Sequence, residues 1–534
     1  MYTRKTILVW IGIIVLSGMF LMGQETWPPE IEPDCIGDYL VTDDPEVVAE
    51  NKYYNHVDLS ELSECNAISG SLHIEGTNLT NLQALKTLEF VGGNLQVGPM
   101  NMSLPTCEAD WLWNNIGNKN IRGTVTIQDN NGNEENCPPI DAPDKEWTWV
   151  DFSKAKCANG SSTGIGVSLN SHSPNVHLYL QGGGGCWDEG SCKNTKPSPA
   201  GLVWATHLNG YDEVTFRLEP FLTILFPDSS IFHRGDENPV EEWNYVYVPY
   251  CTGDFFAGNT ITEYGTDADG IPGTEDDVIQ VHHVGYNNIG EYLKRLVPTF
   301  KNAERVLITG TSSGGYGSVF NFDRIQKAFA NPEVPVNARV DQISDGGAFF
   351  IAEHPDDFAC IKPAQQDAMK NSWGLLDENY PHPEGFKEEY PNLYFHDLRR
   401  FLLDKYSKAP YTGDQTRWFG LICAKYDLIL RRFFGDLDLI PDPAFVISEE
   451  KMKEGLFYLT GENSPYAQFS NWKAFILGVG GRMDEGHGFF IFPRQLDHVY
   501  TYDREQDNVK VMLNDWIDKM LYAPESWKTI LPPE

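Results

Sequence analysis

The chain has 534 residues, of which 41% are hydrophobic, and its formal net charge is −36 at pH 7. This length allows two or three packed domains, because single cores rarely grow past roughly 250 to 300 residues. The negative charge argues against nucleic acid or an anionic membrane surface as a partner, and it makes a polyanionic polysaccharide an awkward substrate, because each would be repelled.

Residues 1–24 have the pattern of a signal peptide. Arg4 and Lys5 precede an uncharged run at 7–22, and Gly23 supplies a small residue before a polar, Pro-rich stretch. An uncleaved membrane anchor is the alternative, because the apolar run is long and its cleavage context is poor. In either case we expect the body of the protein outside the cytoplasm, in a periplasm, at the cell surface or secreted. The ten cysteines then favour disulfides over metal sites.

Residues 25–140 are predicted to form a small leucine-rich-like β-solenoid domain. The sequence GSLHI at Gly70 is echoed by GNLQV at Gly93, 23 residues later, with leucines between them. Short strands repeated at this period suit a unit in which each turn buries its apolar edge on the next. The segment resembles the receptor L-domain family, which implies binding to a glycan, a protein partner or the rest of the chain. The resemblance places four cysteines in or near the caps of the domain: Cys35, Cys65, Cys107 and Cys137.

Residues 141–534 follow a Pro- and Asp-rich stretch and are predicted to form an α/β domain. Apolar strand-like runs alternate there with amphipathic helical ones, which is typical of a mostly parallel sheet flanked by helices. Strands are expected at 176–180, 306–308 and 419–424, and helices at 288–300, 316–330 and 509–521.

The strongest catalytic signal is a G-x-S-x-G pattern centred on Ser312, between an apolar strand and a helical stretch. A serine on such a sharp, strained turn needs small residues two positions before and after it, so that strand and helix can approach. We therefore predict Ser312 as the nucleophile of an ester hydrolase. The alternative interpretation is a glycine-rich turn without catalytic meaning.

Four glycines at 182–185 lead directly from the predicted strand that ends at Leu180 into Cys186. Backbone N–H groups in such a run can face a tetrahedral oxyanion without side-chain obstruction. Cys186 and Cys192 are close enough in sequence to close a small loop.

The catalytic base is expected in the loop between the last strand and the last helix of the domain. We interpret 488–492 as that strand and 509–521 as that helix, which puts His498 in the loop. His498 is therefore the preferred base, and His487 is the fallback.

The catalytic acid is expected at the end of an earlier strand, where a carboxylate can orient the imidazole and stabilise its charged form. Asp427 closes the mostly apolar run 418–427 and is preferred. Asp345 is the rival, and we expect it to end the strand that follows the serine.

Five motifs between 145 and 525 resemble, in family order, the pectin acetylesterase family, to which the animal Wnt deacylase Notum also belongs. They are LQGGGGC from Leu180, YCTGD from Tyr250, GYNN from Gly285, GTSSGG from Gly310 and DGG from Asp345. The resemblance implies an α/β-hydrolase fold and a triad formed by Ser312, Asp427 and His498. It also implies oxyanion donors at the amides of Gly183, Gly184 and Ser313, and a disulfide between Cys186 and Cys192.

Two departures from the family pattern matter. A glycine stands where the family usually has an aromatic residue in the oxyanion run, and Ser313 replaces the more common alanine. Neither removes a backbone donor, but the first reshapes the pocket wall, so the substrate cannot be carried over.

These features predict a secreted serine carboxylesterase that removes O-acyl, most simply O-acetyl, groups from an extracellular glycan and needs no cofactor for catalysis. One alternative is a Notum-like lipid or protein deacylase, which needs a deep apolar pocket. The other is a non-catalytic binding or adhesion protein on a hydrolase fold, against which the serine, the histidines and the glycine run all count.

One acidic stretch, 265–277, places carboxylates at alternating positions around glycine turns. This pattern suits a structural Ca²⁺, which takes six to eight oxygen ligands. A solvated acidic loop is the alternative. The candidate ligands are Asp267, Asp269, Asp276 and Asp277.

Overall fold

A computed structural model describes residues 32–134, 137–195, 204–219, 230–235, 238–266, 277–330, 338–348, 363–408, 410–433, 447–461, 463–478, 487–489, 499–506 and 508–532. The segment predicted as a signal peptide lies outside these ranges. Among the described residues, the structure has no helix that is both long and apolar enough to cross a membrane.

The chain divides into two compact units, Met1–Asn133 and Glu134–Glu534. This division falls a few residues before the boundary expected at 140/141. The reason is that the intervening stretch is bonded to the second unit. The amide of Ile140 donates to Thr299 Oγ1 over 2.7 Å, and Arg295 donates to the carbonyl oxygen of Pro138 over 3.2 Å.

The first unit is built on short parallel strands: β1 (Tyr39–Val41), β2 (Asn55–His56), β4 (Leu72–Ile74), β6 (Leu95–Val97) and β7 (Val125–Ile127) in one sheet, and β3 (Ala67–Ile68) with β5 (Phe90–Val91) in another. Equivalent positions of the sequence repeat are paired in neighbouring strands of the sheet: Leu72 pairs with Leu95, and Leu95 pairs with Val125. These three positions pack against leucines of the connecting segments. The helices are α2 (Pro45–Glu50) and α3 (Thr106–Ile116). That this unit is a receptor L-domain stays a prediction.

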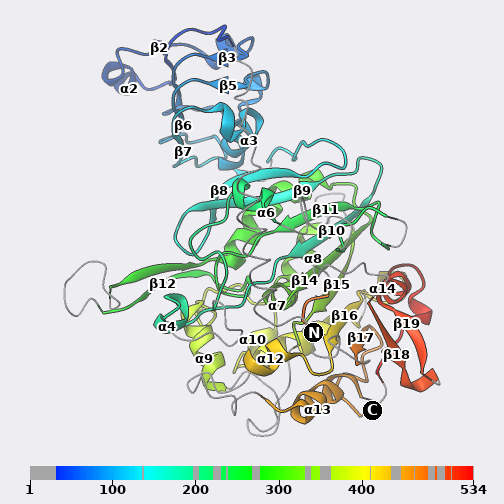
Figure 1. Ribbon diagram of the computed structural model, residues 1–534. Helices are drawn as coiled ribbons and strands as arrows, with labels where there is room; N and C mark the ends of the chain where they lie inside the picture. Colours follow the sequence, from blue (N-terminus) through cyan, green and yellow to red (C-terminus); the bar gives the residue numbers. More distant parts are fainter. Residues whose placement is uncertain are drawn as a thin grey trace, which may run out of the picture. The chain divides into compact units, whose positions relative to one another are not determined.

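The second unit contains an eight-stranded sheet in the order β17-β16-β15-β14-β10-β11-β9-β8 (Figure 1). All neighbouring pairs are parallel except those of β9, which runs antiparallel to both β8 and β11. The strands are β8 (Thr148–Lys156), β9 (Ser162–Ser168), β10 (Asn175–Leu180), β11 (Asn244–Val248), β14 (Arg305–Thr311), β15 (Arg339–Asp345), β16 (Phe419–Ala424) and β17 (Trp472–Leu477).

Helices cover both faces of this sheet, because alternate side chains of the buried strands point to opposite sides. One face packs on α6 (Gly285–Thr299), α7 (Ser313–Phe320), α8 (Phe322–Phe329) and α11 (Phe395–Lys405). The other packs on α5 (Glu213–Arg217) and α14 (Leu513–Tyr522). The unit therefore has the α/β-hydrolase fold that the sequence predicts.

The remaining elements of this unit are the hairpins β12 (Thr260–Tyr264) with β13 (Ile279–His283) and β18 (Tyr500–Asp503) with β19 (Val509–Met512), and the helices α4 (Glu189–Cys192), α9 (Pro363–Ser372), α10 (Phe386–Glu389), α12 (Leu428–Phe433) and α13 (Glu449–Thr460).

The end of the chain differs from the prediction in two places. The helix expected at 509–521 begins as strand β19 and becomes helical only at Leu513. Gly488 and Phe489, expected to open the last strand, are not in a strand, and 490–498 lie outside the described residues. Among the described strands of the large sheet, β17 comes last in the chain, and its apolar residues are buried at the far side of β16.

Disulfides connect Cys35 with Cys65, Cys157 with Cys251, and Cys186 with Cys192. Cys107 and Cys137 are also disulfide-bonded, whereas Cys423 is a buried free thiol. So many disulfides fit a protein that folds in an oxidising, extracytoplasmic compartment.

Candidate active site

Ser312 occupies a strained turn between β14 and α7. Its backbone has φ 56° and ψ −119°, in the region of positive φ that residues with side chains rarely adopt. Its amide donates a hydrogen bond to the carbonyl oxygen of Asp345 over 2.7 Å, which fixes the turn against the end of β15. Strain of this kind, held by its neighbours, is typical of a nucleophile elbow.

The glycines around Ser312 allow strand and helix to approach closely. A Cβ atom on Gly314 would lie 2.0 Å from the carbonyl oxygen of Leu180, and one on Gly310 would lie 2.2 Å from that of Gly314. Neither position has room for a side chain. The G-x-S-x-G spacing is therefore required by the packing of β14, β10 and α7.

The glycine run at 182–185 passes directly beside the nucleophile. A Cβ atom on Gly182 would lie 3.2 Å from the Cβ of Ser312. Within the described part of the chain, nothing accepts a hydrogen bond from the amides of Gly183 and Gly184. Ser313 is the first residue of α7, so its amide has no acceptor within the helix. These three N–H groups are available to an oxyanion next to Ser312.

Asp427 lies between β16 and α12 and is 1% exposed. Its Oδ1 accepts hydrogen bonds from the amides of Ile429 and Leu430, each over 3.0 Å, which fixes the carboxylate at the start of the helix. Its Oδ2 contacts Nδ1 of His487 over 2.8 Å. Because the carboxylate can only accept, Nδ1 carries the proton and Nε2 presents a lone pair.

His487 is held at the same end of the sheet as Ser312. Gly346 has φ 68°, and a Cβ atom there would lie 3.0 Å from Cε1 of the imidazole. Gly346 follows Asp345, whose carbonyl oxygen binds the amide of Ser312. Nε2 of His487 is buried and has no hydrogen-bond partner among the residues that the structure describes. It is therefore free to accept a proton.

The charges around His487 favour its protonated form. Burial alone lowers the pKa of this imidazole, but the charge and hydrogen bond of Asp427, with a smaller contribution from the charge of Asp345, raise it above the ordinary value. The side chain of Asp345 is itself bonded to the hydroxyl of Thr311 over 3.0 Å. The imidazole thus pairs with Asp427, and the charge of Asp345 adds to the effect.

The structure pairs Asp427 with His487 rather than with a later histidine, and His498 lies outside the described residues. The prediction preferred His498 because it read 488–492 as the last strand. The signal that could have pointed to His487 is the apolar run 472–477, which forms β17. With β17 as the last strand, His487 falls in the loop that follows it.

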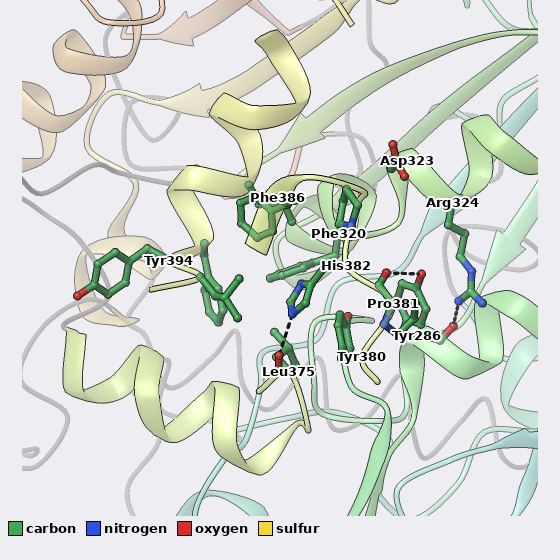
Figure 2. A pocket seen from close by; sticks show the side chains of 14 residues that line it. Tyr286, Phe320, Asp323, Arg324, Leu375, Tyr380, Pro381, His382, Phe386 and Tyr394 are labelled. Atoms are coloured by element: carbon green, nitrogen blue, oxygen red, sulfur yellow. Dashed lines mark hydrogen bonds between the residues drawn. The ribbon is translucent and has the colours of Figure 1, made fainter. Parts of the chain in front are cut away.

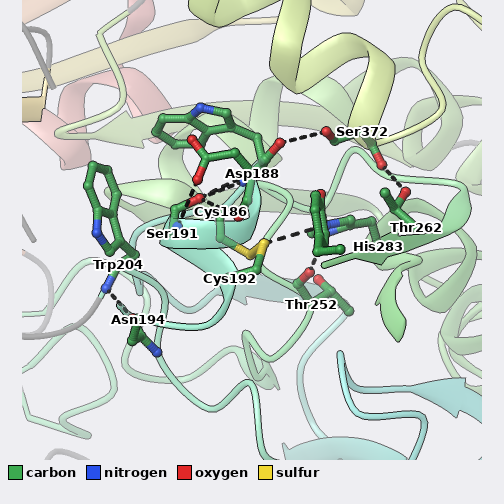
Figure 3. Close-up of a disulfide and its surroundings, with 12 residues drawn as sticks. Cys186, Asp188, Ser191, Cys192, Asn194, Trp204, Thr252, Thr262, His283 and Ser372 are labelled. Carbon is green, nitrogen blue, oxygen red and sulfur yellow. Dashed lines mark hydrogen bonds between the residues drawn. A yellow bond between two sulfur atoms is a disulfide. The ribbon is translucent and has the colours of Figure 1, made fainter. Parts of the chain in front are cut away.

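The disulfide between Cys186 and Cys192 closes the loop that follows the glycine run (Figure 3). This loop is also bonded to α9 and the turn after it, because Ser372 Oγ donates to the carbonyl oxygen of Trp187 over 2.6 Å and Trp373 Nε1 donates to that of Cys186 over 2.8 Å. The disulfide and these hydrogen bonds therefore hold the loop that follows the glycine run in place.

Among the described residues, Cys186, Cys192 and His283 are the one group of three potential metal ligands. Both thiols are consumed by the disulfide, so the group offers no thiolate. Of the predicted calcium ligands, Asp267, Asp269 and Asp276 lie outside the described residues, and Asp277 is placed just before β13. A calcium site there stays a prediction.

An aromatic-lined pocket lies on the side of α8 that faces the segment 375–398 (Figure 2). Arg324 lies over the ring of Tyr286 at 3.8 Å, and His382 is bonded to the carbonyl oxygen of Leu375. Only about 20 Å³ remains free, which is room for about one water molecule. This pocket is lined by none of the candidate catalytic residues.

A strained serine, a free backbone oxyanion site and a buried Asp–His pair at the carboxyl ends of parallel strands have the geometry of an α/β-hydrolase active site. Residues 144–374 match the family model of the pectin acetylesterases (Pectinacetylesterase). This segment of the chain is therefore similar to that family. The matched segment contains the glycine run and Ser312, whereas Asp427 and His487 lie beyond it, so their assignment rests on the geometry.

Named relatives fall on both branches of the family. The chain is 28% identical to palmitoleoyl-protein carboxylesterase notum2 of Xenopus laevis over 237 residues, 42% of each chain. It is 27% identical to pectin acetylesterase 4 of Arabidopsis thaliana over 248 residues, 45% of this chain and 53% of that one. It is 26% identical to NOTUM of Drosophila melanogaster over 243 residues, 44% of this chain and 31% of that one. The chain thus spans about half or less of these relatives. A solved structure of the Drosophila Wnt deacylase Notum aligns with a TM-score of 0.47 at 18% identity, over 73% of this chain and 97% of that one.

Proposed function

We propose that this protein is a serine carboxylesterase in which Ser312 is the nucleophile, His487 the base and Asp427 the orienting acid. The observation that carries the proposal is the 2.8 Å contact between His487 Nδ1 and Asp427 Oδ2. Nε2 of the same ring has no hydrogen-bond partner among the described residues, and the ring lies beside Gly346, the residue that follows the Ser312-bound Asp345. The relatives named as pectin acetylesterase and palmitoleoyl-protein carboxylesterase are ester hydrolases by name, which supports the same reaction class.

The reaction follows from what each group can donate or accept. His487 Nε2 takes the proton of Ser312 Oγ as that oxygen attacks the ester carbonyl, and Asp427 stabilises the imidazolium. The amides of Gly183, Gly184 and Ser313 bind the oxyanion. The imidazolium then gives its proton to the leaving alcohol oxygen, which leaves an acyl-serine. A water molecule, deprotonated by His487, releases the acid and restores the hydroxyl of Ser312.

The acyl group proposed is small, most simply acetyl, on an extracellular glycan. Among the described residues, aromatic rings pack against the glycine run: a Cβ atom on Gly185 would lie 2.7 Å from Cε1 of Phe255. Trp187 and Trp204 stand edge to face next to it, with ring centroids 5.5 Å apart, and Phe433 contacts both. Rings packed this closely leave little room for a long chain. The net charge of −36 favours a glycan of low negative charge.

A lipid or protein deacylase is the second candidate, and the relatives named as palmitoleoyl-protein carboxylesterases favour it. For the first unit we propose a binding role, toward the glycan or a protein partner. On β4, β6 and β7 of this unit, the half-buried side chains of His73, Gln96 and Thr126 stand in register.

The test is hydrolysis of p-nitrophenyl acetate, butyrate and palmitate by the full chain beside Ser312→Ala, with acetate release from acetylated xylan and pectin. We expect serine-dependent turnover that falls as the acyl chain lengthens. A preference for palmitate would select the lipid deacylase. No serine-dependent turnover on any of these esters would leave a binding protein on a hydrolase fold.

A further inference from the structure

Glu219 is a buried carboxylate close to the oxyanion run, and the mechanism above does not use it. We infer that Glu219 is a positioning residue that acts through Gln181 to hold the amides of the glycine run in place. This inference rests on the proposed esterase function and deepens it. The proposed effect of Glu219 is on the geometry of the oxyanion donors, and it is transmitted through Gln181.

The side chain of Gln181 is fixed at both ends. Its Nε2 donates to Glu219 Oε1 over 2.8 Å, and its Oε1 accepts from the amide of Tyr250 over 2.9 Å. Its own amide donates to the carbonyl oxygen of Val248 over 3.0 Å. Gln181 is 8% exposed and stands between Leu180, the last residue of β10, and Gly182. It therefore sets the direction in which the glycine run leaves the sheet.

Gln181 itself and its partner Tyr250 both pack against the segments that carry the oxyanion donors. The carbonyl oxygen of Gln181 lies 2.8 Å from the Cβ position of Gly314 at the start of α7. The ring of Tyr250 lies 2.7 Å from the Cβ position of Gly183, and its hydroxyl accepts from the amide of Phe255 over 3.0 Å. A shift of Gln181 would therefore move the run relative to the nucleophile.

Glu219 is held in a nearly closed site. It is 9% exposed, and Oε1 also accepts a hydrogen bond from the hydroxyl of Tyr211 over 3.0 Å. Among the described residues, the phenols of Tyr211, Tyr247 and Tyr179 interact electrostatically with it. Burial raises the pKa of Glu219, while the hydrogen bonds from Tyr211, Gln181 and Tyr247 lower it in part. The buried carboxylate thus accepts hydrogen bonds from amide and phenol donors, which offset the cost of its burial.

The kinetic consequence is specific. Oxyanion donors act in the transition state more than in the ground state, so displacing them lowers kcat and leaves KM nearly unchanged. A residue that only stabilised the fold would change the melting temperature without this split between kcat and KM.

The test exchanges the two partners of the pair. In Gln181→Glu, two carboxylates would face each other across the 2.8 Å contact, and they can hold together only while they share one proton. We expect kcat on p-nitrophenyl acetate to fall at least about tenfold between pH 6 and pH 9 relative to the wild type, with KM within about twofold. The double variant Gln181→Glu/Glu219→Gln restores one carboxylate and one amide, so kcat should return to within about threefold of the wild type.

Tyr211→Phe is the matched control, because it removes a different hydrogen bond to Glu219 Oε1 but leaves Gln181 bonded. We expect its kcat to stay within about threefold of the wild type. A folded swap variant that remains as slow as Gln181→Glu, or a Tyr211→Phe variant equally slow, would overturn the inference.

The swap variant decides the question even if Gln181→Glu alone does not fold, because it keeps one carboxylate and one amide in the pair. Serine-dependent turnover by the wild type is the reference for every variant. Its absence would count against the proposed function itself, whereas an active wild type with an unrestored swap would count against the role of Glu219 alone.

Discussion

Among single residues, the orientation of His487 matters most for the proposed chemistry. Its Nδ1 is committed to Asp427 over 2.8 Å, which leaves Nε2 with a lone pair and no partner among the described residues. Ser312, held at φ 56°, is the proposed proton donor to this nitrogen. The same ring could not serve if its proton were on Nε2, so the buried carboxylate selects the tautomer that can act as a base.

Single substitutions can decide which of the two candidate histidines is the base. We expect His487→Ala to lower kcat on p-nitrophenyl acetate at least about 1,000-fold, because the proton of Ser312 would lose its acceptor. His498→Ala should stay within about threefold of the wild type. The reverse result would make His498 the base and leave the His487–Asp427 pair with a structural role.

The pH profile follows from the pKa of His487. The base acts only when neutral, so kcat/KM should fall as the pH drops through a pKa that lies above 6.5. Asp427→Asn removes the largest effect that raises this pKa. Its acid limb should therefore shift to lower pH while kcat drops by about three to four orders of magnitude. An acid limb that stayed in place would mean that another group controls it.

At the level of strands and turns, the elbow and the glycine run form one packed unit. The carbonyl oxygen of Leu180 lies 2.0 Å from the Cβ position of Gly314, so the end of β10 and the start of α7 touch through their backbones. The serine, its neighbouring amide and the glycine run are positioned by this one contact. Strain at the elbow is sustained because the surrounding sheet leaves the turn no other conformation.

We expect Gly314→Ala to lower the free energy of unfolding by at least about 2 kcal/mol, because the added methyl group would meet backbone that cannot move aside. Gly413→Ala is the control. Nothing lies within 4 Å of its Cβ position, and only its φ of 63° opposes a side chain, so its cost should be about 1 to 2 kcal/mol. Urea unfolding measures both, and equal small losses would contradict the close contact at Gly314.

The disulfides differ in the length of chain that they close. Cys186–Cys192 spans 6 residues in sequence and Cys157–Cys251 spans 94. The entropy of the unfolded chain predicts that replacing both cysteines by alanine costs about 2 kcal/mol for the short loop and about 4 to 5 kcal/mol for the long one. Thermal unfolding of the two double variants tests the order, and a larger loss for the short loop would show that the loop's native contacts dominate.

Over the molecule as a whole, the net charge of −36 should govern which glycans the proposed esterase approaches. Repulsion from a polyanion is screened by salt, whereas a neutral polymer is unaffected. We expect KM for acetylated, partly de-esterified pectin to fall severalfold as NaCl rises from about 0.02 to 0.2 M. KM for acetylated xylan should change less than about 1.5-fold. A salt effect of equal size on both polymers would remove charge as the discriminating factor.

Much of the architecture could be predicted because its signals are local. The strand, elbow and helix around Ser312, the glycine run after Leu180 and the echo of Gly70 at Gly93 each occupy a short stretch of chain, where apolar spacing and glycine placement reflect backbone geometry directly. The strands at 176–180, 306–308 and 419–424 could also be predicted, because each is a short apolar run, and all three lie in the large sheet. The expected helix at 509–521 was wrong in its first turn, since the β-branched Val509 and Val511 pair with β18.

The partners across the chain were not encoded locally. Asp427 and His487 are 60 residues apart, and Gln181 and Glu219 are 38 apart. Which histidine meets the acid depends on where β17 joins the sheet, and a sequence pattern shows that a strand exists without showing its neighbour. Residue types and spacing thus determined the elbow and the reaction class. The order of the parallel strands decided which distant side chains meet at their carboxyl ends, because only packing brings those ends together.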